Sequence, residues 1–194
     1  MENERTTQVN CVIGIDPGAA GGLAVYISRN DGRITRETHV AKMPKDVRDL
    51  ADFFAYYKEN YKPIVFLEKL SVRPDDVAVE GGKPNMGKIY RVQKMMANFE
   101  HLKALIETAG IPYVQCHPMT WQSKLKLRTI GEKEEKADRK RRYQQVAGQL
   151  YPEIKVTLWN ADALLIMHFG VYALANEQKW VKEQLPEREY QKLF

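Results

Sequence analysis

Short apolar runs and turn-forming residues alternate in the first third of the chain. The runs at 11–15 (CVIGI) and 23–28 (LAVYIS) are rich in β-branched and aliphatic side chains, a composition typical of strands. The first run stops at the sequence DPG (16–18), and NDG (30–32) precedes a third extended stretch at 33–43. This pattern predicts three strands that are joined by tight turns and pair in an antiparallel order.

Helical and strand-like spacings then alternate. Between residues 45 and 60, apolar side chains recur every three or four positions, which is typical of an amphipathic helix. They are Val47, Leu50, Phe53, Phe54 and Tyr57. Continuous apolar runs at 64–68 and 111–116 predict buried strands, and the spacing at about 89–108 predicts a helix between them.

Two further helices are predicted in the last third of the chain. A basic segment is expected to be helical up to about residue 150, and Pro152 ends it. Asn160 can cap a helix at 161–178, whose first half is almost wholly apolar and therefore has to pack against the sheet. The elements predict one α/β domain over 1–194. Its mixed five-stranded sheet has three antiparallel strands followed by parallel ones, and helices cover both faces.

Three segments are expected to lie outside this packed unit. Residues 71–88 contain several Gly and Pro residues without any periodicity, which predicts a long mobile loop. Residues 1–9 and about 183–194 are expected to be loose termini.

Composition narrows the class of protein. The chain has 194 residues, is 44% hydrophobic and 28% charged, and lacks the run of about 18 apolar residues that a membrane span needs. Residues 1–10 do not resemble a secretion signal. Cys11 and Cys116 show no zinc-type spacing. We expect both thiols to be reduced in a cytoplasmic protein, associated with the nucleoid or, for a viral protein, located in the host cytoplasm.

Positive charge is concentrated in one segment. The net charge of +5 is modest, but nine of the nineteen residues at 124–142 are Lys or Arg. Such a cluster is typical of a surface that binds a nucleic-acid backbone. Because four acidic residues lie in the same segment, a solvated helix of mixed charge is the alternative interpretation.

Two of the predicted strands end in a carboxylate. Asp16 follows the first apolar run, and Glu68 ends the run at 64–68. If these strands are neighbours, both side chains lie at one end of the sheet, where buried charges without a cation are costly. Asp162 adds a third acid in the first turn of the last apolar helix. Three oxygen ligands without His or Cys favour Mg²⁺ or Mn²⁺, ions that can activate water against a phosphodiester.

Each acid also has a purely structural interpretation. Asp16 can cap the turn that it begins, and Glu68 can pair with Lys69 or with a remote Arg. Asp162 can accept hydrogen bonds from the free amides in the first turn of its helix.

Four motifs occur in an order that resembles a known family. They are GIDPG at 14–18, FLEK at 66–69, GIPYVQCHPMTWQSKL at 110–125 and NADALLIMHF at 160–169. The first, second and fourth resemble the three acidic motifs of the RuvC-type Holliday-junction resolvases (crossover junction endodeoxyribonucleases), which belong to the ribonuclease H-like superfamily. The third is similar to the strand and Pro-x-x-Trp segment of the phage-like branch. The resemblance covers about residues 11–175.

This resemblance implies a ribonuclease H-like fold and a Mg²⁺-dependent endonuclease, for which Mn²⁺ substitutes. It implies a homodimer that binds four-way DNA junctions and nicks two strands symmetrically in DNA recombination and repair. Asp16, Glu68 and Asp162 carry over as catalytic metal ligands. The candidate DNA-binding residues are Lys69, Arg73, Lys83, Lys88, Lys124, Lys136 and Arg139.

The resemblance also suggests roles for the middle of the chain. The loop at 71–88 occupies the place where such resolvases probe the junction, and the following helix resembles their dimer-forming helix. Met95, Met96 and Phe99 would then face a partner, although such a stripe is also typical of a core. Tyr90 and Trp121 are candidates for stacking on unpaired bases, although structural packing is the favoured role for Trp121.

One position departs from the family pattern. The family usually has a fourth acid or a His three positions before the last Asp, where this chain has Trp159. Asp138 or Glu153 can replace that ligand or can simply be surface acids, and water can complete a magnesium shell. His168 lies about 240° around the helix from Asp162, which predicts a core position instead.

The leading hypothesis is therefore a structure-selective DNA endonuclease that resolves four-way junctions. A nuclease of the same fold acting on flaps, ordinary duplexes or RNA–DNA hybrids is one alternative. A junction-binding protein without catalytic activity is another, because a ligand is missing at Trp159. An actin-like kinase needs two such domains, and 194 residues are too few.

Overall fold

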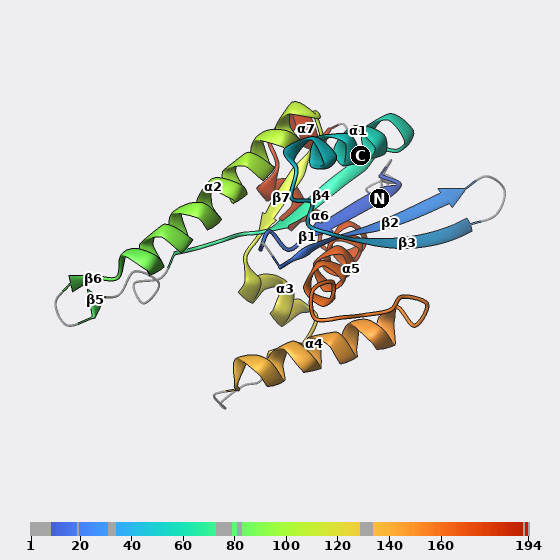
Figure 1. Ribbon diagram of the computed structural model, residues 1–194. Helices are drawn as coiled ribbons and strands as arrows, with labels where there is room; N and C mark the ends of the chain where they lie inside the picture. Colours follow the sequence, from blue (N-terminus) through green and yellow to red (C-terminus); the bar gives the residue numbers. More distant parts are fainter. Residues whose placement is uncertain are drawn as a thin grey trace.

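A five-stranded mixed sheet forms the centre of the computed structural model, which describes residues 9–18, 20–30, 34–72, 79–80, 83–128, 134–191 and 193. The strand order is β3-β2-β1-β4-β7 (Figure 1). The strands are β1 (Cys11–Ile15), β2 (Gly22–Asn30), β3 (Ile34–Lys42), β4 (Pro63–Glu68) and β7 (Tyr113–Cys116). β2 pairs antiparallel with β1 and β3, whereas β4 pairs parallel with β1 and β7. The predicted α/β class and the mixed sheet are confirmed.

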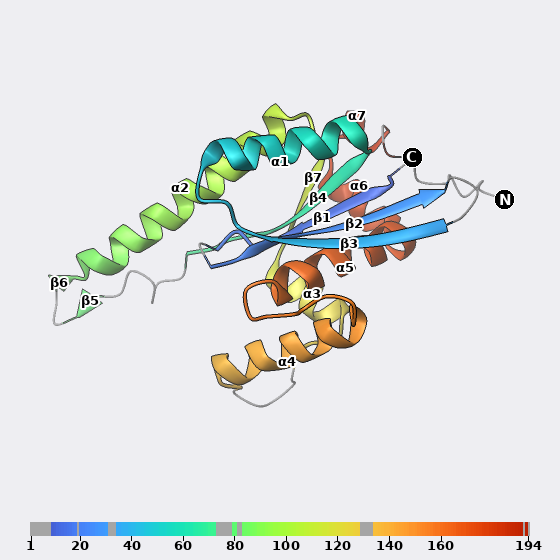
Figure 2. The ribbon, with the colours of Figure 1, turned by 45° about the vertical axis from the view of Figure 1, so that its right-hand side comes forward.

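Helices cover both faces of this sheet (Figures 1 and 2). One face carries α1 (Val47–Asn60) and α2 (Met86–Thr108), and the other carries α3 (Pro118–Lys124), α4 (Lys136–Leu150) and α5 (Ala161–Asn176). Each face has its own cluster of buried apolar side chains. Two short helices, α6 (Gln178–Gln184) and α7 (Glu187–Tyr190), follow α5. None of the helices in the described ranges combines the length and the apolar character needed to cross a membrane.

Strand alternation decides which residues face α5. Cys11, Ile13 and Ile15 belong to the core on the side of α1 and α2, whereas Val12 belongs to the core around α5. Ile64 and Phe66 of β4 also pack in the α5 core. Successive side chains of a strand point to opposite faces, so positions 16 and 68 continue the series that points toward α5.

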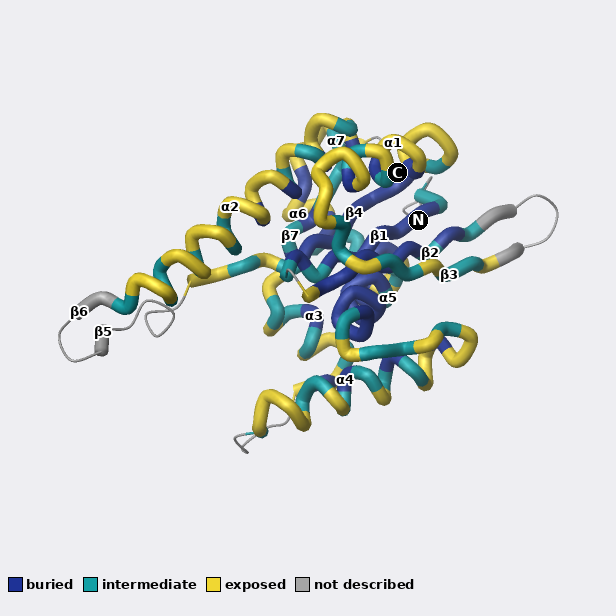
Figure 3. Tube along the Cα trace, in the orientation of Figure 1, coloured by how far each residue is buried: buried dark blue, intermediate teal, exposed yellow. Residues whose placement is uncertain are grey.

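Two glycines let α5 approach the sheet closely. A Cβ atom at Gly14 would lie 2.3 Å from the backbone nitrogen of Met167, and one at Gly170 would lie 2.6 Å from the Phe66 ring. No larger residue fits at either position without moving the helix. The almost wholly buried helix at the centre of Figure 3 is therefore held in one place against β1 and β4.

Two sequence predictions need correction. The segment predicted as a loop contains a small antiparallel pair, β5 (Val79–Glu80) with β6 (Lys83–Pro84), and α2 already begins at Met86; residues 73–78 and 81–82 lie outside the described residues. The C-terminal segment was predicted to be loose, but its described residues include the short helix α7, and Leu185 and Leu193 pack into the α5 core. That segment is too short for its apolar spacing to be recognised. Residues 1–8 of the predicted N-terminal tail are not described.

Candidate active site

Asp16 begins a tight turn directly after β1. Its backbone N–H donates to the Gly22 carbonyl at 3.1 Å, and its carboxylate Oδ1 accepts from the Gly18 N–H at 3.2 Å. The turn is compact, since a Cβ at Gly21 would lie 2.2 Å from the Asp16 carbonyl oxygen. Burial, and then the charge of Asp162, raise the pKa of Asp16. Asp16 therefore does cap its turn, as one structural interpretation proposed, but its carboxylate also lies within the field of a second acid.

Glu68 ends β4 beside Asp16. The parallel register places Leu67 opposite Ile15, so the residues that follow each of them emerge at the same end of the sheet. The indole Nε1 of Trp121 donates to Glu68 Oε1 at 3.1 Å. Burial, followed by the charges of Asp16 and Asp162, raises the pKa of Glu68 to about 8. The hydrogen bond from Trp121 orients Glu68, whereas the sequence suggested Lys69 or a remote Arg as its partner.

Asp162 completes the group from the first turn of α5. The residue is only 7% exposed. Its Oδ2 is paired with the ammonium group of Lys140, while its Oδ1 is buried and has no hydrogen-bond partner. A buried carboxylate oxygen without a partner is energetically costly, and such an atom is suited to receive a ligand. The carboxylate of Asp162 is therefore paired with Lys140 and not with the free amides in the first turn of its own helix.

Lys140 of α4 brings positive charge to all three acids. Besides its ion pair with Asp162, its charge lowers the pKa values of Asp16 and Glu68. Sequence reasoning noted only a basic segment and did not single out this lysine. It also missed the contact of Trp121 with Glu68. Both contacts, Lys140 with Asp162 and Trp121 with Glu68, join residues that are far apart in the sequence. Lys140 and Asp162 are 22 positions apart, and Trp121 and Glu68 are 53 apart.

The donor set suits a hard divalent ion. Three carboxylates without His or Cys are the ligands that Mg²⁺ and Mn²⁺ prefer, and the unpartnered Asp162 Oδ1 offers one of them directly. As the side chains stand, however, the described residues contain no ready-made metal site of three or more His, Cys, Asp or Glu groups. The chemistry of the residues fits the ion, but their side chains have to adjust before they can share it.

The position of the missing fourth ligand is filled by an aromatic ring. The Trp159 ring lies against Gly22, where an added Cβ would meet it at 2.9 Å, and the Lys42 ammonium is 5.9 Å from the ring centroid. Glu153 is exposed, and Asp138 is exposed and pairs with Arg141, so both behave as surface acids. His168 lies away from the site, as predicted, with its Nδ1 2.9 Å from the Tyr151 hydroxyl.

The candidate DNA-binding residues differ in their exposure and pairing. Lys69, Lys124 and Lys136 are exposed, whereas Lys88 and Arg139 are half-buried. Lys124 pairs with Glu177 at 2.5 Å. Arg73 and the side chain of Lys83 lie outside the described residues. Ion pairs within the basic segment, Arg142 with Glu134 and Arg141 with Asp138, show that its mixed-charge interpretation holds for part of it.

Some of the aromatic and Met residues that were candidates for base stacking or dimer contact are buried, and others are exposed. Trp121 is fully buried and in edge contact with Tyr143, so it cannot stack on a base. Tyr90 is 65% exposed. Phe99 is buried in the core and Met96 packs against that core, so the core interpretation holds for these two residues.

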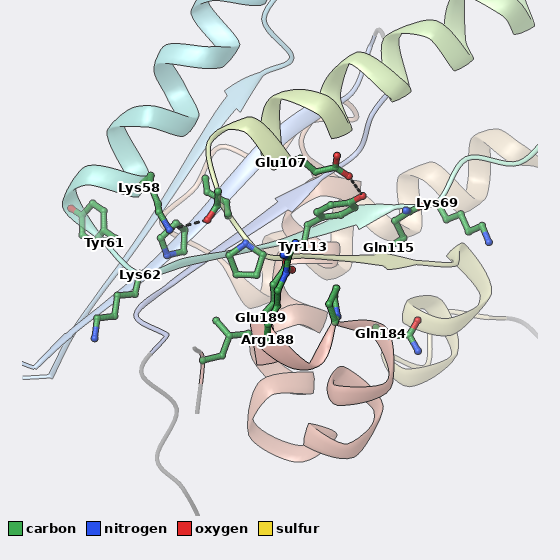
Figure 4. A pocket seen from close by; sticks show the side chains of 16 residues that line it. Lys58, Tyr61, Lys62, Lys69, Glu107, Tyr113, Gln115, Gln184, Arg188 and Glu189 are labelled. Atoms are coloured by element: carbon green, nitrogen blue, oxygen red, sulfur yellow. Dashed lines mark hydrogen bonds between the residues drawn. The ribbon is translucent and has the colours of Figure 1, made fainter. Parts of the chain in front are cut away.

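A cavity of about 1170 Å³ lies elsewhere, along the edge strand β7 (Figure 4). It is lined by residues of α1, α2, β7, α6 and α7, with Lys58, Lys62, Lys69 and Arg188 among its basic groups. Lys58 Nζ donates to the Gly110 carbonyl and the Tyr113 hydroxyl donates to Glu107, so part of this polar lining is satisfied internally. None of the three acids lines the cavity.

Comparisons with known proteins identify the fold. No family model matches the sequence, and no curated protein is significantly similar to it. The chain is similar to the solved structure of Thermus thermophilus RuvC, with a TM-score of 0.52 and 16% sequence identity over 85% of this chain and 95% of that chain. For T. thermophilus RuvC in complex with a Holliday junction substrate the TM-score is 0.50, with the same identity and coverage.

Fowlpox virus resolvase in complex with Holliday junction DNA also matches, at a TM-score of 0.44 and 15% identity over 86% of this chain and 98% of that chain. The match to RuvC confirms the ribonuclease H-like fold that the sequence motifs implied.

Proposed function

We propose that this chain is a metal-dependent endonuclease that resolves four-way DNA junctions by paired, symmetric nicks. One observation carries the proposal: Asp16, Glu68 and Asp162 come from three separate elements and meet at one end of the sheet, on a fold shared with RuvC. RuvC itself has been solved with a Holliday junction substrate. The charge of Asp162 raises the pKa of Asp16, and the charges of Asp16 and Asp162 raise the pKa of Glu68. Carboxyl groups with pKa values raised in this way are typical of functional sites.

The residues of the site have two different roles, to hold the metal ion and to orient the carboxylates that hold it. Asp16, Glu68 and Asp162 would hold Mg²⁺, or Mn²⁺ in its place. A bound ion of this kind supplies a Lewis acid and an activated water for phosphodiester hydrolysis. Trp121 holds Glu68 in one orientation through its indole N–H, and the turn at Gly18 does the same for Asp16. Both carboxylates therefore lose little freedom when they bind an ion.

Basic residues around the site would bind the DNA backbone. Lys136 and Arg139 lie on α4, the helix that also carries Lys140. Phosphate contacts of this kind give affinity that falls steeply with salt, while the shape of the junction gives selectivity. Lys124 can contribute once its ion pair with the half-exposed Glu177 opens.

Cleavage of a labelled four-way junction tests the proposal. We expect paired nicks at symmetric positions in Mg²⁺ or Mn²⁺, no cleavage in chelator, and little cleavage of a linear duplex with the same arm sequences. Asp16→Asn is expected to remove the activity, because an amide cannot replace a negatively charged ligand. Equal cleavage of the linear duplex would contradict junction selectivity and favour a ribonuclease H-like nuclease with flap, duplex or hybrid substrates.

A junction-binding protein without catalytic activity is the second candidate. Trp159 at the fourth-ligand position favours it, as does the need for the three acids to rearrange. It predicts salt-sensitive binding to the junction in gel-shift experiments and intact DNA in either metal. The same junction assay therefore separates the two candidates.

We further propose that the protein acts as a homodimer through the N-terminal half of α2. Met86 and Tyr90 are 69% and 65% exposed there, and Ile89 and Val92 are half-exposed on a helix that extends beyond the sheet in Figure 1. An exposed apolar helix face favours association. Light scattering is expected to give twice the chain mass, and Ile89→Asp is expected to halve it. Arg91→Asp, at an exposed position on the opposite side of the same helix, serves as the control, and a monomeric wild type would contradict the dimer.

A further inference from the structure

The ammonium group of Lys140 lies close to the three acids, where its positive charge interacts with their carboxylates as a bound metal ion would. Its ammonium group pairs with Asp162 Oδ2, and its charge also lowers the pKa values of Asp16 and Glu68. No other lysine or arginine acts on both of these carboxylates among the causes of their shifts. The lysine is thus the positive centre of the site in the absence of metal.

The charges of the site do not balance with Lys140 alone. One ammonium group acts on three carboxyl groups, of which Asp162 is buried and Asp16 and Glu68 are half-buried, and one oxygen of Asp162 remains without a partner. The side chain of Lys140 is 30% exposed, while that of Asp162 is 10% exposed. An amine on a flexible stem can therefore turn out to solvent, whereas the acids are held by the sheet and by α5.

We propose that Lys140 is a built-in counter-cation that keeps the three acids together without metal and competes directly with the divalent ion for Asp162. This inference rests on the proposed function, because it concerns the same metal site. It accounts for two observations at once. The acids lie close together although the described residues form no ready-made metal site, and the basic group that acts on them, Lys140, is on a side chain that can leave.

Local contacts hold α4 in position while Lys140 moves. Tyr143 and Ala147 of α4 are buried in the core around α5. Arg142 binds both carboxylate oxygens of Glu134, at 2.9 and 2.7 Å, and the Leu127 carbonyl oxygen at 2.6 Å. The exchange of an ammonium group for a metal therefore requires rotation of the Lys140 side chain and adjustment of the carboxylates, while these contacts keep α4 in place.

Binding of Mg²⁺ to Lys140→Met, measured by titration calorimetry of the metal-free protein, tests the inference. Methionine keeps the apolar stem and removes the charge, so the variant is expected to bind Mg²⁺ roughly tenfold or more tightly than the wild type. Lys140→Gln is measured alongside as a second variant. Arg141→Met is the matched control, since Arg141 is exposed on the same helix and pairs with Asp138 instead.

Thermal unfolding gives a readout that does not depend on activity. In chelator, both Lys140 variants are expected to melt below the wild type, because the buried acids lose their counter-ion, and Mg²⁺ is expected to raise their melting temperatures by more than it raises that of the wild type. If the wild type binds Mg²⁺ and neither variant binds it more tightly, the competition is overturned and the metal site stands. If neither wild type nor variants bind Mg²⁺ or Mn²⁺, both proposals fail.

Discussion

Replacement of Asp162 by asparagine is expected to lower metal-dependent cleavage of a four-way junction by on the order of a thousandfold or more. Asp162 is the only one of the three acids that has an oxygen without a hydrogen-bond partner among the described buried side chains. Asparagine has nearly the same shape but no charge, so one of the three charged ligands is lost while the packing of α5 on the sheet is kept.

Initial cleavage rates of wild type and Asp162→Asn, with junction in excess and Mg²⁺ at saturation, give the comparison. Asp138→Asn is the matched control, because Asp138 was the other acid considered as a ligand and is exposed; it is expected to cleave at the wild-type rate. Gel shifts in chelator should show that Asp162→Asn still binds the junction. A variant that cleaves as fast as the wild type would exclude Asp162 as a ligand.

Replacement of Glu68 by glutamine is expected to stabilise the metal-free protein at alkaline pH. In the fold, the pKa of Glu68 is raised to about 8 from its ordinary value of 4.5. Between these values the unfolded chain has released its proton and the folded chain still holds it. The group's contribution to stability is therefore present below pH 4.5 and is lost as pH rises toward 8. Glutamine has no proton to lose, and its side-chain oxygen can still accept the Trp121 hydrogen bond.

Urea unfolding in chelator from pH 5 to pH 9 measures this effect. The free energy of unfolding of Glu68→Gln is expected to exceed that of the wild type by an amount that grows across this range, to on the order of 2 to 4 kcal/mol above pH 8. Glu153→Gln, at an exposed site, is the control and is expected to follow the wild type. In Mg²⁺ the order should reverse, because only the wild type gains stability from the ion. A glutamine variant that is less stable throughout would show that Glu68 is charged in the fold.

The two predictions describe one property of the site. The acids destabilise the chain when they have no sufficient counter-charge, and a divalent ion bound at the proposed site would relieve that cost. Binding of the ion would then be linked to deprotonation of Glu68, and we expect the affinity for Mg²⁺ to rise with pH up to about 8. Lys140 relieves part of the cost in the absence of metal, which is why its removal and the removal of Glu68 have opposite effects on stability.

Several parts of the molecule could be predicted from local patterns alone. Alternating and continuous apolar runs identified all five strands of the main sheet, because strand and helix periodicities differ and each element buries one face or both. Asp16 and Glu68 were found because a polar residue at the end of a buried run stands out. Gly110 follows the end of α2, and its φ of 63° is the left-handed backbone that glycine provides where a helix ends.

Other features depend on contacts between distant parts of the chain. The small sheet of β5 and β6 has two-residue strands, and the helical C-terminal segment has few apolar positions, so neither has enough residues to establish a period. The sequence favoured structural packing for Trp121 but left base stacking open, for a similar reason. An aromatic residue has the same appearance in the sequence whether it is exposed or, as here, fully buried.

The sequence by itself determined the order of the elements, the class of fold and the three acids that are candidates for metal binding. Only the tertiary structure decided which positively charged side chain lies close enough to offset the negative charges of these acids. The close approach of α5 at Gly14 and Gly170 sets where Asp162 meets the sheet, and the packing of α4 on α5 sets which of several basic residues reaches it. Burial and Coulomb interactions depend on distances through space, and those distances exist only after strands and helices far apart in the sequence have packed together.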